Sequence, residues 1–133
     1  MCVFCKIANH EIPSNVVYED DQVLAFLDIS PVTKGHTLII PKKHYDNFSD
    51  CDSDTIKQIH EVSKKLVGHY QPILKPDGYN LISNMNSAAG QSVFHVHFHL
   101  IPRYDDNDGL VLLFNHDESI QYTKDEINQL AIK

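Results

Sequence analysis

The sequence lacks tryptophan and has few glycines (five) and cysteines (three), and none of its basic clusters is longer than a pair. With a formal charge of −7, it lacks the many lysine and arginine contacts on which binding to polymeric nucleic acid depends. No apolar run approaches the roughly 18 residues of a membrane span, and the first residues do not resemble a signal peptide. Three cysteines do not suggest a disulfide framework. We therefore expect a cytoplasmic protein without membrane or polymeric nucleic-acid partners.

Length and patterning predict a single domain over residues 1–133. This length is close to the commonest domain size, and 42% hydrophobic residues are enough for one core. Short strand patterns and segregated helices predict an α+β fold with a mainly antiparallel sheet, one long helix and short terminal helices. The expected strands are 15–18, 23–28, 37–40, 79–83 and 93–101, and the expected helical segments are 2–8, 54–70 and a short one from 123.

The long helix is predicted from apolar residues at three- and four-residue spacing, with Ser53 or Asp54 as its N-cap. The residues on this face are Ile56, Ile59, Val62, Leu66 and Tyr70. The last helix is predicted from the capping box Thr123-Lys124-Asp125-Glu126.

Nine histidines are many for this length, and three of them alternate as His95, His97 and His99. On a strand these three would share one face, about 6.5–7 Å apart, while the apolar residues between them face the core. Those apolar residues are Phe94, Val96, Phe98 and Leu100. Burying three imidazoles side by side would require a hydrogen-bond partner for each, so the row favours function over structure.

Two chemistries fit the row. Neutral imidazoles bind zinc, and an imidazole can also attack phosphorus as a nucleophile while its neighbours orient it. The spacing alone does not distinguish them. The preceding loop Ser87–Ser92 is built of small residues that let backbone N–H groups approach an anion, and Gln91 and Ser92 add side-chain donors. This loop favours phosphate chemistry.

The segment His95-Val96-His97-Phe98-His99-Leu100-Ile101 resembles the signature of the histidine triad (HIT) family, in which apolar residues separate the histidines. Further similar blocks occur in family order, so the resemblance spans roughly residues 2–104 and is nearest to the bacterial Hint-like branch. Those blocks are 4–7, 12–14, 18–20, 24–31, 40–44 and 90–93. From Asp105 onward the resemblance ends.

This resemblance implies a dimeric purine nucleotide hydrolase in which His97 attacks the α-phosphorus and forms a nucleotidyl-histidine intermediate. His99 and Ser92 would contact the phosphate or leaving group, and Asp28 would accept hydrogen bonds from the ribose. The implied nucleotide-binding residues are Phe4, Ile7, Phe26 and Ile29 around the base, with Asp28, Asn84, Gly90, Gln91, Ser92, Val93, His97 and His99. For His97 to attack through one ring nitrogen, the other must be protonated, and we expect a backbone carbonyl to hold it. A protonated His99 would stabilise the developing charge.

A second site is predicted from Cys2-x-x-Cys5, a spacing typical of zinc-binding segments, although two ordinary thiols are the alternative. The resemblance supplies His44 and His95 as the other ligands. Four protein ligands would close the site, which makes the zinc structural. Cys51 is interpreted as an incidental thiol and His36 as a residue at a strand start.

The leading hypothesis is the release of a nucleoside monophosphate from a phosphoramidate, dinucleoside polyphosphate or acyl-nucleotide. AMP is the favoured nucleoside monophosphate. One alternative is a zinc-dependent hydrolase with the histidine row as ligands. Another is a nucleotide-binding regulatory module with weak hydrolysis. The resemblance places the homodimer surface on the long helix and Tyr79–Ser83.

Overall fold

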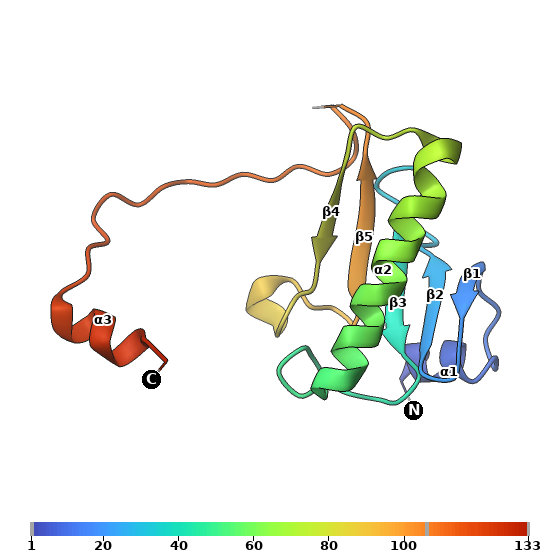
Figure 1. The fold of residues 1–133 in the computed structure, drawn as a ribbon, viewed down its shortest axis with the longest axis horizontal. Helices are drawn as coiled ribbons and strands as arrows, with labels where there is room; N and C mark the ends of the chain where they lie inside the picture. The colour runs from blue at the N-terminus through green and yellow to red at the C-terminus, as the bar shows by residue number, and fades with distance from the viewer. Residues whose placement is uncertain (1, 106, 133) are drawn as a thin grey trace.

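The computed structural model describes residues 2–105 and 107–132. Its centre is a five-stranded antiparallel sheet in the order β1-β2-β3-β5-β4, which confirms the predicted α+β class (Figure 1). The elements are α1 (Val3–Ala8), β1 (Val16–Glu19), β2 (Val23–Leu27), β3 (Thr37–Pro41), α2 (Ser53–Leu74), β4 (Gly78–Ile82), η1 (Ser87–Ala89), β5 (Phe98–Arg103) and α3 (Lys124–Leu130). Among the helices of the described residues, none is long and apolar enough to cross a membrane.

The two faces of the sheet carry separate apolar clusters. Helix α2 lies along one face, where four of its five predicted apolar residues are buried and Ile56 packs at the edge (Figure 1). On the opposite face, Phe4 and Ile7 of α1 pack against Leu24, Phe26 and Leu38. Because both faces of the sheet are covered, β2 and β3 are buried on both sides and their sequences lack the alternation of apolar and polar residues.

Helix α2 is longer than predicted at both ends. The N-cap is Asp52 and not Ser53 or Asp54, because the extended backbone of Asp52 lets its carboxylate accept from the Thr55 N–H at 2.7 Å. At the other end the helix passes Tyr70 and includes Pro72 before Lys75 ends it in the left-handed conformation.

Strand β5 differs from the prediction of a strand over 93–101, since it begins at Phe98. Pairing with β3 stops at Ile39 opposite Phe98, because Pro41 has no N–H to donate to the ladder. The Pro41 carbonyl instead accepts from the ring of His95 at 2.8 Å, and the Val96 N–H donates to Tyr45 O. Val96, Phe98 and Leu100 are buried as predicted, but Phe94 is 45% exposed, so its assignment to the core was wrong.

The C-terminal end of β5 also differs, because the strand runs through Pro102 to Arg103. At this position β5 pairs only with β4, with Tyr79 opposite Pro102, since its pairing with β3 ends at Leu100. A proline is tolerated where one side of a strand is open.

The chain leaves the sheet after β5 and runs to α3, away from the body of the molecule (Figure 1). The predicted capping box is present, with the Glu126 N–H donating to Thr123 Oγ1 and the Thr123 N–H to the Glu126 carboxylate. Every residue from 111 to 132 is exposed. We call residues 110–132 the C-terminal arm.

A buried hydroxyl pair that joins α2 to β3 allows a test of this packing. Thr37 Oγ1 donates to Gly35 O, so Tyr70 must donate the 2.7 Å bond to Thr37 Oγ1. We expect Tyr70→Phe to lower the free energy of unfolding by about 1 kcal/mol in urea denaturation, since it leaves a buried acceptor without its donor. Tyr79→Phe removes a hydroxyl that bonds the exposed Gln71 amide and should change it by less than about 0.5 kcal/mol. Equal effects of the two variants would contradict the assignment.

Candidate active site and metal site

A pocket of about 530 Å³ opens on the face of the sheet that carries α1. Its apolar part comes from α1 and the end of β2, and its polar part from Asp28 and the segment that leads into β5. The residues predicted to bind nucleotide that line it are Phe4, Ile7, Phe26, Asp28, Ile29, Ser92, Val93, His97 and His99. The volume and the mixed lining are typical of a small-molecule site.

Three predicted residues, Asn84, Gly90 and Gln91, are not among those that line the pocket. The Gln91 side chain is 3% exposed, and its amide donates to the carbonyls of Asp46 and Val93. Gln91 therefore holds the loop in place, and the predicted use of its amide on a phosphate is not what the structure shows. Gly90 has a φ of 98° and lies beside the Asn84 amide, so this pair shapes the turn before Ser92.

His97 is held in one tautomer by the backbone. Its Nδ1 lies 2.8 Å from the carbonyl oxygen of His95, and because a carbonyl only accepts, Nδ1 carries the proton. The Nε2 atom is then left with a free lone pair. Burial lowers the pKa of His97, which keeps the ring neutral. The expected backbone acceptor is present, although it belongs to a residue outside the regular strand.

His99 is oriented by His36, a residue that sequence reasoning left without a chemical role. The Val32 N–H donates to His36 Nδ1 at 3.2 Å, so His36 Nε2 carries the proton and donates to His99 Nδ1 at 2.9 Å. The proton of neutral His99 is therefore on Nε2. Asp28 Oδ2 lies 3.6 Å from His36 Nε2.

Burial and the neighbouring rings of His97 and His36 lower the pKa of His99 to about 4. At neutral pH this ring is uncharged, in contrast to the expectation of a protonated His99. It still presents an N–H donor at Nε2, because His36 has fixed its tautomer. The sequence alone gives no signal for this role of His36, because it depends on the strand register: Leu38, two residues after His36, pairs with His99 on the neighbouring strand. Since side chains at i and i+2 share a face, the register places His36 beside His99.

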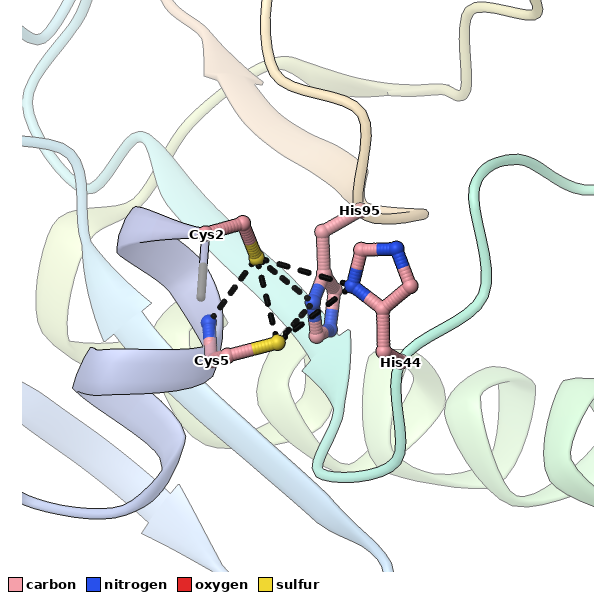
Figure 2. A group of neighbouring side chains, drawn as sticks. All are labelled: Cys2, Cys5, His44 and His95. Carbon is pink, nitrogen blue, oxygen red and sulfur yellow. Dashed lines mark hydrogen bonds between the residues drawn. The ribbon is translucent and has the colours of Figure 1, made fainter.

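Cys2, Cys5, His44 and His95 converge from three parts of the chain (Figure 2). Cys2 is the N-cap of α1 and Cys5 lies in its first turn, His44 follows β3, and His95 precedes β5. Their ligand atoms all lie within 4.8 Å of one another, so this group could hold a metal ion. Cys51 is not part of this group. Burial raises the pKa of its thiol to about 11, which keeps the thiol protonated at neutral pH.

The sulfur–nitrogen distances of the four ligands fit a tetrahedral zinc ion. Zn–S bonds of about 2.3 Å and Zn–N bonds of about 2.0 Å place sulfur and nitrogen about 3.5 Å apart and the two sulfurs about 3.8 Å apart. The sulfur–nitrogen distances are 3.3–3.6 Å, whereas the two sulfurs are 3.1 Å apart and would have to separate to admit the ion. Both histidines turn Nδ1 toward the sulfurs, because Nε2 of His44 donates to Asp46 and Nε2 of His95 to Pro41 O. Such partners are typical of metal-bound histidines.

The histidine row itself does not form a metal site in the part of the chain that the structure describes. His95 faces the thiols, whereas His97 and His99 face the pocket. A second group of candidate ligands consists of Asp28, His36 and His99. Both nitrogens of His36 are already engaged in hydrogen bonds, which accounts for this cluster without an ion.

Comparison with known proteins identifies the family. The profile of the HIT domain matches residues 9–106, well over half of the chain. The chain belongs to the HIT family. It is 50% identical over 123 residues to an uncharacterized HIT-like protein of Methanocaldococcus jannaschii, covering 90% of this chain and 92% of that protein. It is 41% identical over 111 residues to the adenosine 5'-monophosphoramidase of Saccharomyces cerevisiae, and the match covers 84% of this chain and 68% of that protein.

Solved HIT structures share the whole architecture. A HIT family protein from Bacillus anthracis has a TM-score of 0.89 at 43% identity and covers 97% of this chain and 91% of its own. A histidine triad nucleotide-binding protein from Candida albicans has a TM-score of 0.84 at 36% identity, and the match covers 98% of this chain and 92% of that protein. Relatives of this family include named hydrolases, and the chain is an enzyme of the HIT family.

The hydrogen bonds of His99 lead to a prediction for its titration. Because the folded pKa is about 4 and the ordinary value is 6.5, the unfolded chain binds this proton first as the pH falls. His99 therefore lowers stability progressively between pH 6.5 and 4 and has no such effect above this range. We expect ¹⁵N-edited NMR to show neutral His99 with its proton on Nε2 from pH 7 to 5, and His36→Phe to yield a mixture of tautomers. A His99 that titrates near 6.5, or carries its proton on Nδ1, would contradict the assignment.

Proposed function

We propose that this protein is a nucleotide hydrolase that releases a nucleoside monophosphate through a nucleotidyl intermediate on His97. AMP is the favoured product. The observation that carries the proposal is the bond from His97 Nδ1 to His95 O, which leaves Nε2 as a neutral nucleophile in the pocket. Two relatives from fungi are named adenosine 5'-monophosphoramidase, which supports a phosphoramidate as the first substrate to test. Dinucleoside polyphosphates and acyl-nucleotides carry the same nucleoside phosphate.

In the proposed reaction, the Nε2–phosphorus bond forms while the bond from the α-phosphorus to the leaving group breaks. Water then attacks the phosphorus, the Nε2–phosphorus bond breaks, and the monophosphate leaves. His99 lies next to His97, with 5.0 Å between ring centroids, and its Nε2–H can stabilise charge on the phosphate or leaving group. The exposed Ser92 hydroxyl in the same pocket serves as a further donor.

The remaining pocket residues suit a purine nucleoside. Phe4, Ile7 and Phe26 form an apolar slot for the base, with the Phe4 ring 5.1 Å from the His97 ring. Asp28 Oδ1 accepts from the Ser30 N–H at 2.8 Å, so the carboxylate is held in position to accept bonds from ribose hydroxyls. Ile29 is 95% exposed at the pocket and is free to cover a bound base.

Replacement of the nucleophile tests this proposal. We expect His97→Ala to lower kcat for adenosine 5'-phosphoramidate by at least about 1000-fold, because no other group can form the covalent intermediate, while AMP binding changes little. His69→Ala alters an exposed histidine of α2 and should leave both unchanged. Brief exposure of the wild-type protein to substrate should add one adenylyl group on His97, detected by intact mass and peptide mapping. Unimpaired turnover in His97→Ala would end the assignment.

We further propose that Cys2, Cys5, His44 and His95 hold a structural zinc ion, since all four tetrahedral positions come from the protein. When bound, the ion supplies a cross-link and no open position for water. It would tie α1, which lines the base slot, to the segment that carries His97. The carbonyl of the ligand His95 is the acceptor that orients His97, so the two sites share one residue.

A matched pair of cysteine variants tests the zinc proposal. Wild-type protein should contain one zinc per chain by elemental analysis, and Cys5→Ser should lose it, whereas Cys51→Ser should keep it. At free zinc 1,000 times the dissociation constant, loss of binding lowers the unfolding free energy by about 4 kcal/mol. Turnover should persist in zinc-depleted protein for as long as circular dichroism shows the fold intact. Immediate loss of activity in depleted but folded protein, restored by zinc, would favour a catalytic ion instead.

The proposed assembly is a homodimer through β4 and α2. Strand β4 is the last in the sheet order, so one of its edges lacks a neighbouring strand within the described residues. Beside it lies a groove whose apolar lining comes from Val67, Gly68 and the 44% exposed Leu81, and whose polar lining comes from His60, Ser63 and Lys64. An unprotected edge next to an apolar groove is suited to pairing with a second copy. The cytoplasmic location stays a prediction.

A further inference from the structure

The thiols of Cys2 and Cys5 lie in contact with each other in the candidate metal site. Their Sγ atoms are 3.1 Å apart, and the Cys5 N–H donates to Cys2 Sγ at 3.2 Å. A tetrahedral zinc ion would hold the two sulfurs about 3.8 Å apart, so they are closer together here than the ion would keep them. Two thiols at the Cys-x-x-Cys spacing and at this distance are also arranged to form an intramolecular disulfide.

A small oxidant can reach this pair of thiols. Cys2 and Cys5 are free cysteines of intermediate exposure. An accessible thiol with a second thiol beside it is the usual arrangement of redox-sensing cysteines, because the second thiol resolves the first oxidation product. Cys51, the third cysteine of the chain, differs: it packs beneath α2 on the other face of the sheet, and its raised pKa leaves it protonated and slow to react.

Oxidation of the pair by hydrogen peroxide balances without a further cofactor. One thiol attacks the peroxide, the O–O bond breaks, and a sulfenic acid and one molecule of water are formed. The other thiol then attacks this sulfur, the S–S bond forms, and a second molecule of water leaves. The two sulfurs together lose two electrons, which the peroxide oxygens gain, and a zinc ion bound there would leave as Zn²⁺ because it has no redox chemistry of its own.

A disulfide would remove both sulfur ligands from the candidate metal site. Thiolates bind metal ions and disulfide sulfurs do not, so only His44 and His95 would remain and the ion would be released. Cys2 Sγ and Cys5 Sγ each lie 3.4 Å from His95 Nδ1. The His95 ring is fully buried, and its Nε2 already donates to Pro41 O. Its Nδ1 would therefore be left buried without a partner, which is unfavourable and would loosen this part of the fold.

The same cysteines flank a residue of the candidate nucleotide pocket. Phe4 lies between them in the sequence, and its ring centroid is 6.1 Å from that of His95 and 5.1 Å from that of His97. The His95 carbonyl is also the acceptor that orients His97. A change at the sulfur pair therefore reaches both the base slot and the proposed nucleophile through residues in direct contact.

We propose that Cys2 and Cys5 are an oxidative modification site: hydrogen peroxide converts them to an intramolecular disulfide, which releases the metal ion and weakens nucleotide binding in the adjoining pocket. This inference rests on the proposed zinc site and the proposed nucleotide pocket. Reduction by a dithiol returns both thiols, and renewed zinc binding then restores the pocket. The pair thus couples the oxidation state of the chain to its affinity for nucleotide.

Treatment of the zinc-loaded, full-length protein with hydrogen peroxide tests the switch, in a Cys51→Ser background that leaves only the two thiols. Intact mass should show the loss of two hydrogen atoms, and peptide mapping should join Cys2 to Cys5. A chromogenic chelator should detect zinc at the rate at which the disulfide forms. The Kd for AMP should rise at least about fivefold, because a loosened base slot must be ordered again on binding. Dithiothreitol followed by zinc should reverse all of these changes.

Cys5→Ser in the same background is the matched control. It keeps Cys2 but cannot form the disulfide, so peroxide should not change its affinity for AMP.

The outcomes separate the inference from the proposals on which it rests. If peroxide that oxidises free cysteine leaves the ion and both thiols in place, or joins two chains instead, the switch is overturned while the zinc site stands. A disulfide that forms without any change in the Kd for AMP overturns the coupling to the pocket. A chain that never contains zinc overturns the zinc proposal and the release step together. The hydrolase assignment is decided by the adduct on His97, so none of these results bears on it.

Discussion

The hydrogen bond from the ring of His97 to the carbonyl of His95 is the interaction on which the site depends. It holds the Nδ1 proton, and so determines which nitrogen of His97 can act as a nucleophile. The same residue, His95, donates its own ring proton to Pro41 O and turns Nδ1 to the thiols. One residue therefore connects the end of β3, the candidate metal ligands and the proposed nucleophile, and a shift of its backbone would disturb all three.

A backbone group also controls the tautomer of His99, the second histidine of the candidate active site, through one intermediate ring. The Val32 N–H fixes His36, and His36 fixes His99, so the tautomer of His99 is determined without a charged partner in direct contact with it. Burial lowers the pKa of His36, His97 and His99, so these rings are uncharged at neutral pH. Because burial lowers the pKa of His99, its contribution at neutral pH is an oriented N–H donor.

Much of the fold follows from local patterns, and what does not follow depends on pairing between distant segments. The periodicity of Ile59, Val62 and Leu66 identifies α2 because one helical face packs on the sheet. The start of β5 could not be read in the same way, since it is set by the missing N–H of Pro41, which lies 57 positions earlier than Phe98. His36 and Gln91 show the same limit: their hydrogen bonds to His99 and Asp46 join segments whose proximity is a property of the folded chain.

The segment 93–97 before β5 belongs to no helix or strand, and it carries His95 and His97 of the two candidate sites. The alternation nevertheless continues through this segment, because Val96, Phe98 and Leu100 pack in the cluster beneath α2. His95 and His97 both contact Phe4 of α1, on the opposite face of the sheet. The three histidines therefore share one face, as predicted, and what divides them is the group that each one meets there. His95 meets the thiols of Cys2 and Cys5, whereas His97 and His99 line the pocket, so the position of α1 over the sheet separates the two candidate sites.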